Sequence, residues 1–309
     1  MNKTQIQHYL TDLNLPSPGS HKGQNGKLLI IGGSELFHAA SRWSLDIASK
    51  LVDMIFYTSV PSNNQLILEA KKNFWNGIVV AREDLEDYIH EADCILIGPG
   101  MMRHQLDAKP ENDNREYYLN NSPTLQEWQD NTQKIVNYLL SKYPNKKWVI
   151  DAGALQMMNP NLLTNTCIIT PHLKELKIVI NKLGQEQRVK FSQNDLNSMS
   201  SLSLLNKLLN NALILLKGQA DVITHGQETY EIKGGNAGMT KGGTGDVLAG
   251  LVAGLYTTNQ ILPSAIVASY INKIAGEILY QSVGPFYNAS DLLNTIPRML
   301  WEELKQANS

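Results

Sequence analysis

The stretch that decides the fold is GGNAGMTKGGTGDVLAGLVAGL, which runs from Gly234 to Leu255. Its first half, up to Gly245, contains too much glycine for the interior of a helix or a strand. From Asp246 onward the residues are apolar on nearly every side, which predicts a fully buried helix. A glycine-rich loop that runs into such a helix leaves the first backbone N–H groups unpaired at the positive end of the helix dipole. The sequence therefore predicts an anion-binding site at this point.

Asp246 is an acid at the predicted anion site, and two roles fit it. One is structural, because aspartate is a favoured N-cap residue. The other is chemical: a carboxylate at this place can act as a base beside a phosphoryl group in transfer, while the N–H groups of Gly243, Thr244 and Gly245 stabilise the charge. Because Asp246 follows GGTG, we favour the chemical role.

The composition narrows the class of protein. Of the 309 residues, 42% are hydrophobic and 18% are charged, as expected for a globular protein with a full core. A net charge of −2 gives no sign of a nucleic-acid or membrane-surface partner. Cys94 and Cys167 each lie in an apolar run, so we expect buried thiols and neither a disulfide nor a metal-binding pair. The N-terminus has no apolar signal core, and no run approaches the ~18 apolar residues of a membrane span. We expect a cytoplasmic protein.

Short apolar runs alternate with helical patterns along most of the chain. The runs that we predict to be strands lie at 27–34, 54–60, 77–80, 94–100, 147–153, 167–171 and 212–218. Apolar strands that alternate with helices indicate a mostly parallel sheet covered on both faces. Residues 220–232 alternate in polarity around a His-Gly-Gln turn, which predicts a hairpin near the edge of the sheet. We predict one α/β domain over residues 1–309, with ligands beyond the carboxyl ends of the strands.

The motifs at these strand ends together resemble one family. The string NAGMTKGGTGDVLAG at 236–250 is similar to the signature of the ADP/ATP-dependent NAD(P)H-hydrate dehydratases, a branch of the ribokinase-like superfamily. Four further stretches match it: GPG at 98–100, DAGAL at 151–155, TPHLKE at 170–175 and LKGQAD at 216–221. The resemblance implies a three-layer α/β/α ribokinase-like fold. It also implies repair of hydrated NADH or NADPH (NADHX or NADPHX, S epimer) through a phosphorylated intermediate, with ADP or ATP as the phosphoryl donor.

The resemblance assigns roles residue by residue. It makes Asp246 the base that accepts the hydroxyl proton and places the anion hole at Gly243, Thr244 and Gly245. It places substrate contacts at Ala40, Gly100, His172 and Asp246. The adenine-nucleotide pocket falls on Lys217, Gly218, Gln219, Ala220, Asp221 and Gly245.

The resemblance also implies a cofactor and partners. Glu175 would act on Mg²⁺ through water, since magnesium often keeps several of its waters in protein sites. A separate NAD(P)H-hydrate epimerase would interconvert the hydrate epimers, and members of the family often form homo-oligomers. Two other functions stay open: a ribokinase-like small-molecule kinase of the hydroxyethylthiazole or hydroxymethylpyrimidine type, and a non-catalytic nucleotide-binding protein.

Several positions depart from the family pattern. Ala39 stands where relatives usually carry glycine, and Gly153 replaces the second acid of Asp-Ala-Asp-Ala-Leu. We expect the remaining acid, Asp151, to accept hydrogen bonds from loop N–H groups or water. Lys241 is expected to add a positive charge near the phosphates, and Ser290 is expected to cap the last helix.

Residues 102–124 form a polar, Asn-rich insertion that is longer than the family norm. Such a composition is typical of a mobile surface loop. The alternative is a lid over the dinucleotide, in which Tyr117 and Tyr118 would offer stacking faces.

Overall fold

The computed structural model describes residues 1–309 except 2, 104–112, 125, 185–198 and 309. Within these residues nine strands form one sheet in the order β3-β2-β1-β4-β5-β6-β7-β8-β9. Their bounds are β1 (Lys27–Ile31), β2 (Met54–Thr58), β3 (Ile78–Val79), β4 (Cys94–Ile97), β5 (Lys147–Ile150), β6 (Cys167–Ile169), β7 (Leu213–Leu216), β8 (Asp221–His225) and β9 (Glu228–Ile232). All neighbours from β3 to β7 are parallel, whereas β8 and β9 form an antiparallel hairpin at the edge. The predicted parallel sheet and edge hairpin are both confirmed.

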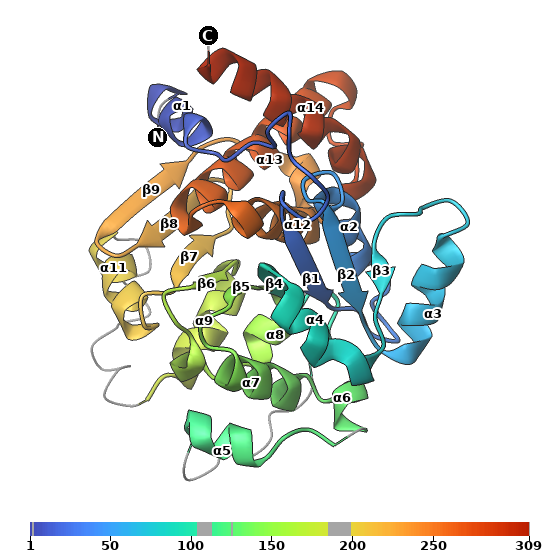
Figure 1. Ribbon diagram of the computed structural model, residues 1–309. Coiled ribbons are helices and arrows are strands. Elements are labelled where there is room, and N and C mark those ends of the chain that lie inside the picture. The colour runs from blue at the N-terminus through green and yellow to red at the C-terminus, as the bar shows by residue number, and fades with distance from the viewer. Residues whose placement is uncertain (2, 104–112, 125, 185–198, 309) are drawn as a thin grey trace.

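Helices cover both faces of the sheet (Figure 1). Alternate strand residues point to opposite faces, so Leu28 and Ile30 belong to one core and Leu29 and Ile31 to the other. The first core is closed by α1 (Lys3–Thr11), α2 (Ala39–Ala48), α3 (Pro61–Ala70), α12 (Thr244–Thr258), α13 (Ile261–Val283) and α14 (Ala289–Ala307). The second is closed by α4 (Leu85–Glu91), α5 (Arg115–Asn120), α7 (Thr132–Lys142), α8 (Ala152–Met157), α9 (Leu173–Lys182) and α11 (Met199–Leu208). This is the expected three-layer α/β/α fold.

The helix of the opening motif, α12, lies in the middle of the first layer. It begins at Thr244, two residues before the predicted start, and every residue from Val247 to Thr257 is buried. Gly250 allows α12 to approach α2 closely, because a Cβ there would lie 2.6 Å from the Ser44 carbonyl oxygen. At the other end, the Lys147 ammonium at the start of β5 donates to the carbonyls of α12's last turn, which places a cation at the negative end of the dipole. The N-terminus of α12 therefore faces the carboxyl edge of the sheet.

Part of the predicted loop at 102–124 is ordered helix. The short helix α5 is held against α7 by the Arg115 guanidinium, which donates to the carbonyls of Leu140 and Leu162 at 2.6 Å each. Tyr118 is buried and its hydroxyl donates to Asp113 at 2.5 Å. The prediction of a mobile loop is therefore wrong for α5, and Tyr118 has no free stacking face. Residues 104–112 of this insertion lie outside the described residues.

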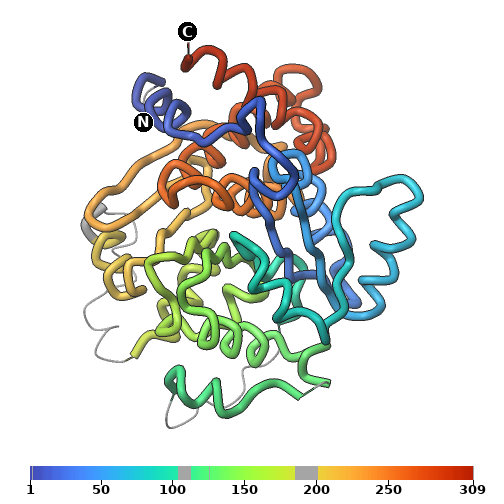
Figure 2. The backbone as a smooth tube through the Cα atoms, in the orientation of Figure 1, coloured from blue at the N-terminus to red at the C-terminus, as the bar shows by residue number. Residues whose placement is uncertain are grey.

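The two ends of the chain lie side by side (Figure 2). Lys3 of α1 donates to the side chain of Gln306 in α14 at 2.7 Å.

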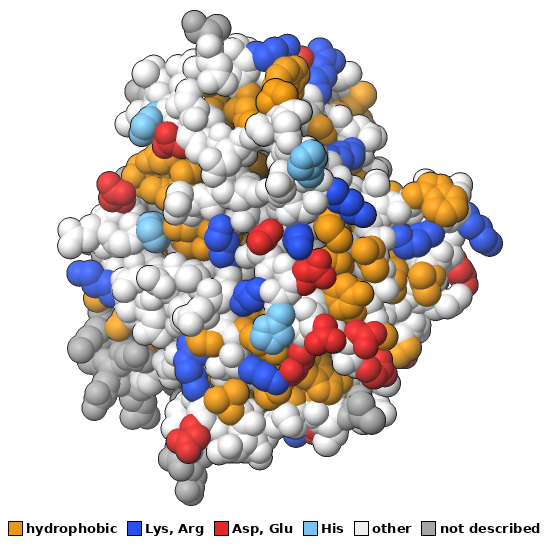
Figure 3. Space-filling view, in the orientation of Figure 1, with side chains coloured by type: hydrophobic (Ala, Val, Ile, Leu, Met, Phe, Trp, Pro, Cys, Tyr) orange, Lys and Arg blue, Asp and Glu red, His pale blue; other side chains and the backbone are white. Residues whose placement is uncertain are grey.

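The predicted cap at Ser290 is wrong: Asn288 is the N-cap of α14, and its side chain accepts from the Ser290 N–H at 2.8 Å. Over the described residues no helix is long and apolar enough to cross a membrane. On the face shown in Figure 3, Lys and Arg side chains are interspersed with acidic ones.

Candidate active site

The glycine-rich loop presents free backbone donors at the start of α12. Gly243 is the N-cap and has φ = 97°, and a Cβ there would lie 2.3 Å from the Trp43 ring, so only glycine fits. Among the described residues, the N–H groups of Gly243 and Gly245 have no hydrogen-bond partner, that of Thr244 makes one long bond of 3.4 Å to the Lys241 carbonyl, and that of Asp246 donates to its own carboxylate. Unpaired backbone donors at the start of a helix favour the binding of an anion.

Asp246 is the third residue of α12 and not its cap. Gly243 takes the N-cap position without a side-chain hydrogen bond, so the structural role for Asp246 as an N-cap is wrong. Burial, followed by the negative charge of Asp151, raises the pKa of the Asp246 carboxyl to about 7. A carboxylate with a pKa near neutrality is suited to accept a proton and release it again.

One ammonium and three carboxylates gather next to this helix start. The Lys217 Nζ lies 2.8 Å from Asp151 Oδ1 and 3.9 Å from Glu175 Oε2. Burial alone would lower the pKa of Lys217, but Asp151 and Glu175 outweigh it and raise the pKa, so the ammonium stays charged. The expectation that Asp151 accepts from loop N–H groups is wrong: its partner is Lys217, and Asp151 is only 1% exposed. With Asp246 the cluster carries more negative than positive charge.

His172 and Glu175 hold each other at the start of α9. The His172 Nδ1 accepts from the Glu175 N–H at 3.2 Å, and Glu175 Oε2 accepts from the His172 N–H at 2.9 Å, which is a capping box. The other ring nitrogen, Nε2, lies 3.6 Å from Glu175 Oε2. Glu175 Oε1 accepts from Gln156 at 3.0 Å, so both of its oxygens are already engaged.

A cavity of about 630 Å³ opens beside the free donors of α12. Of the residues predicted to bind the nucleotide, those that line it are Lys217, Gly218, Gln219, Asp221 and Gly245. Ala220 does not line it. Asp221 is buried and bound to Lys273 at 3.1 Å and Ser269 at 2.7 Å, so its carboxylate fixes the loop after β7. We call this space the α12 cavity.

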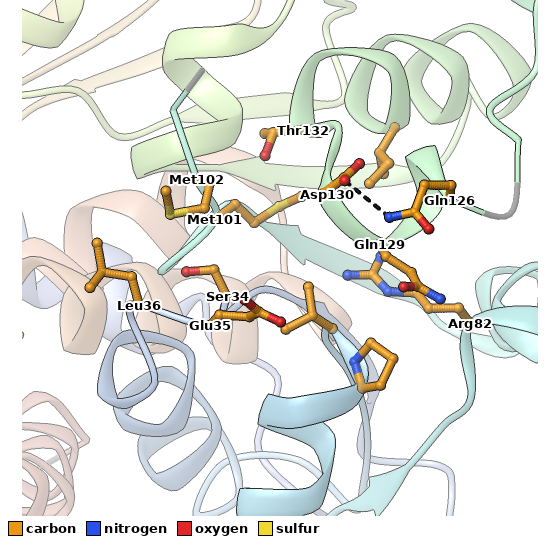
Figure 4. A pocket seen from close by; sticks show the side chains of 14 residues that line it. Ser34, Glu35, Leu36, Arg82, Met101, Met102, Gln126, Gln129, Asp130 and Thr132 are labelled. Carbon is orange, nitrogen blue, oxygen red and sulfur yellow. Dashed lines mark hydrogen bonds between the residues drawn. The ribbon is translucent and has the colours of Figure 1, made fainter.

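A second cavity of about 560 Å³ lies at the ends of β1 to β4 (Figure 4). It is lined by Gly33, Ser34, Val60, Arg82 and Met101, and by α6 (Glu127–Asp130) and the start of α7. Two predicted substrate contacts lie at its border: a Cβ on Gly100 would be 3.1 Å from the Cα of Gly33 and 3.2 Å from the Cβ of Ala40. Of the other two predicted contacts, His172 lines the α12 cavity instead, and Asp246 lies in the first turn of α12. We call this second space the β1–β4 cavity.

Two features of the β1–β4 cavity have no counterpart in the sequence motifs. Asn63 supports Gly33 from behind and donates to the Tyr57 hydroxyl at 2.6 Å and to Ser59 Oγ at 2.9 Å. Arg82 follows the short strand β3 and reaches the cavity wall. The rule applied to the other strands, that polar residues after a buried strand mark the site, would have found Arg82.

Gly153 has a structural reason in this chain. A Cβ at this position would lie 2.1 Å from the Met101 carbonyl oxygen, so the backbone after β4 occupies the space that a side chain would need. The change from acid to glycine therefore accompanies a close approach of the segment that contains Gly100 and Met101.

Lys241 does not place its charge where we expected it. Its ammonium donates to the carbonyls of Pro285 and Tyr287, in the connection between α13 and α14.

Among the described residues no group of three or more His, Cys, Asp or Glu side chains could hold a metal ion directly. An ion that keeps several of its waters, as Mg²⁺ often does, needs fewer direct protein ligands than such a group would supply.

The comparison with known proteins agrees with the sequence motifs. The profile of the NAD(P)H-hydrate dehydratase family matches residues 28–298. The bifunctional NAD(P)H-hydrate repair enzyme of Methanocaldococcus jannaschii is 31% identical over 288 residues, which cover 91% of this chain and 49% of that protein. The ADP-dependent (S)-NAD(P)H-hydrate dehydratase of Nitrosopumilus maritimus is 29% identical over 286 residues, which cover 91% of this chain and 90% of that protein. The chain thus spans about half the length of the bifunctional relatives that it matches.

A solved structure shares the fold over nearly the whole chain. The ADP/ATP-dependent NAD(P)H-hydrate dehydratase of Bacillus subtilis, co-crystallised with ATP and Mg²⁺, superposes with a TM-score of 0.68 and covers 97% of each chain at 19% identity. At this identity the likeness establishes the architecture, while the match of the profile to most of the sequence establishes the kinship. The chain belongs to the NAD(P)H-hydrate dehydratase family.

Proposed function

We propose that this protein dehydrates the S epimer of NADHX or NADPHX to NADH or NADPH, with ADP or ATP as the phosphoryl donor. The observation that carries the proposal is the position of Asp246, a carboxylate whose pKa is about 7, at the unpaired N–H groups that open α12. A base and an anion site at one place are what transfer of a phosphoryl group to a hydroxyl requires. Family membership indicates which hydroxyl receives it.

In the proposed reaction Asp246 takes the proton of the substrate hydroxyl, and the start of α12 binds the phosphoryl group that is transferred. The hydroxyl oxygen on the hydrated nicotinamide ring attacks the terminal phosphorus of the nucleotide, and the bond from that phosphorus to the bridging oxygen breaks. Asp246 accepts the hydroxyl proton, and the N–H groups of Gly243, Thr244 and Gly245 stabilise the charge on the transferred group. The lone pair of the ring nitrogen then expels inorganic phosphate, and loss of a ring proton restores the double bond.

The remaining predicted residues have positioning roles in this proposal. Lys217, Gly218, Gln219 and Asp221 would surround the nucleotide in the α12 cavity, with Ala220 in the same loop but off the cavity wall. Ala40, Gly100 and His172 would contact the hydrated coenzyme. Mg²⁺ would neutralise phosphate charge, held through water by Glu175, whose own oxygens are engaged by His172 and Gln156. A separate epimerase would supply the S epimer.

The test is to incubate the purified protein with Mg²⁺, NADHX or NADPHX, and ADP or ATP in parallel. We expect nucleotide-dependent growth of the near-ultraviolet absorbance of the reduced ring, with release of inorganic phosphate. D246N should lower the rate by about 10²- to 10⁴-fold, because it removes the base. D12N, which neutralises an exposed acid next to α1, is the matched control and should keep full activity.

Two outcomes would contradict the proposal. A folded wild-type protein that binds nucleotide but restores no reduced coenzyme would be a binding protein. A stable phosphorylated product without phosphate release would identify a small-molecule kinase, which uses the same fold and the same anion site.

A further inference from the structure

Arg82 is a partly buried cation that has no counter-ion within the described ranges of the chain. Its side chain lines the β1–β4 cavity, and among the described residues its only hydrogen bond runs from Nε to the Ser59 carbonyl at 3.0 Å. Its Nη1 is shut off from solvent and has no hydrogen-bond partner. Burial lowers the pKa of Arg82 to about 10, a value at which the guanidinium is still charged at neutral pH.

The acids that line the same cavity do not neutralise this charge. Glu35 and Asp130 both line the cavity, but neither forms an ion pair with Arg82 within the part of the chain that the structure describes. Asp130 accepts instead from Gln126 at 3.2 Å, and the Gln129 side chain lies beside Arg82 (Figure 4). A desolvated charge without a partner is costly, so its retention calls for a compensating ligand.

The other described arginines show how unusual this is. Arg42 and Arg298 each pair with a carboxylate, that of Asp46 and that of Glu302. Arg103 and Arg115 each donate from a terminal nitrogen to an oxygen, that of Gln156 and those of two carbonyls. Among these described arginines, Arg82 alone has neither a carboxylate partner nor an acceptor on a terminal nitrogen.

The surroundings of Arg82 hold it in a fixed position. Ser59, whose carbonyl accepts from Arg82, is itself fixed by Asn64, which accepts from the Ser59 N–H at 2.9 Å, and by Asn63, which donates to Ser59 Oγ. A planar guanidinium that is held in this way suits the two-pronged binding of a phosphate. The cavity has the size of a typical small-molecule site, and it borders the predicted substrate contacts Ala40 and Gly100.

We propose that Arg82 is a specificity-determining residue that binds a phosphate oxyanion of the hydrated coenzyme in the β1–β4 cavity. Two groups of that coenzyme carry this chemistry: the 2′-phosphate, which only the NADPH form has, and the diphosphate, which both forms share. The inference rests on the proposed function, because it takes the coenzyme as the occupant of this cavity.

The experiment compares the binding of NADPH, NADH and ADP to the wild type, R82Q, R82K and R298Q by titration calorimetry. Loss of charge-assisted hydrogen bonds should weaken coenzyme binding to R82Q by about 10- to 100-fold, and R82K should recover part of the loss because it keeps the charge without the fork. If R82Q binds only NADPH more weakly, Arg82 contacts the 2′-phosphate. If R82Q binds both coenzymes more weakly by the same factor, Arg82 contacts the diphosphate. R298Q removes a guanidinium from α14, which does not line the cavity, and should bind as the wild type does.

Three results would overturn the inference: coenzyme binding by R82Q equal to that of the wild type, no coenzyme binding by the wild type, or an equal loss of ADP affinity in R82Q. The melting temperature of R82Q should fall only slightly, because the change removes one hydrogen bond and leaves no described carboxylate unpaired; if it falls further, R82K supplies the comparison. Binding of the reduced coenzymes needs no turnover. Arg82-dependent binding by a protein without dehydratase activity would therefore support the inference while the proposed function fails.

Discussion

The two cavities at the carboxyl edge of the sheet differ in how their positive charges are balanced. In the α12 cavity Lys217 is paired with Asp151, and Lys273 with Asp221, through contacts of 2.8 and 3.1 Å. In the β1–β4 cavity Arg82 has no acid partner among the described residues. The lysines of the first cavity therefore serve the fold even without ligand, whereas the arginine of the second gains a partner only when an anion enters.

The largest difference between the cavities should appear in stability. K217M leaves Asp151 and Glu175 buried without their cation, and breaking a buried pair in this way costs about 3–5 kcal/mol. R82M removes a cation whose single hydrogen bond contributes about 1 kcal/mol, and it leaves no charge unpaired. Urea unfolding of both variants measures the two free energies. Equal losses would mean that the contrast between the cavities does not exist.

Asp246 should make the α12 cavity sensitive to pH. Its folded pKa, about 7, lies above the ordinary value of 3.8, so the folded state binds more protons between these values. Stability then falls as pH rises through this window, by at most about 1.4 kcal/mol per pH unit. D246N lacks this titration, and its advantage over the wild type should grow from about pH 4 to about pH 7 and then level off. Thermal unfolding across this range checks it; a constant difference would be the contrary result.

Glycines at the two sites should respond differently to one added methyl group. In G153A the new Cβ would meet the Met101 carbonyl at 2.1 Å, and such overpacking costs about 1–3 kcal/mol. In G242A the new methyl group has no neighbour within 4 Å, so the change should stay within about 0.5 kcal/mol. Chemical denaturation of the pair compares them directly. A tolerated G153A would show that the backbone after β4 can move away.

The sequence predicted the sheet and the opening of α12 well. Buried parallel strands are continuous apolar runs, and a glycine-rich segment is disfavoured in the interior of a helix or strand, so it marks a loop. It could not predict which groups pair across the fold. The Asp151–Lys217 bridge joins residues 66 apart, and no local pattern encodes it. The helix α5 is stabilised by carbonyls of Leu140 and Leu162, so its own Asn-rich composition gave no signal. Arg82 belongs to no motif and was missed, although its position after a strand followed the rule used elsewhere.

Lys241 tests whether a cation next to the anion site in sequence also acts there. Its ammonium is exposed and bonded to the carbonyls of Pro285 and Tyr287, so it already has acceptors away from the N–H groups of α12. Exposed interactions of this kind contribute about 0–1 kcal/mol, and K241Q should therefore change the KM for ADP or ATP by less than about fivefold. K217Q is the comparison, because the Lys217 ammonium lies 3.4 Å from where a Cβ of Gly245 would be. The effect of K217Q on the KM should therefore be larger. If K241Q raised the KM more than K217Q, Lys241 would have to leave its carbonyl acceptors when nucleotide binds, and the α12 cavity would gain a ligand-dependent cation like the one in the β1–β4 cavity.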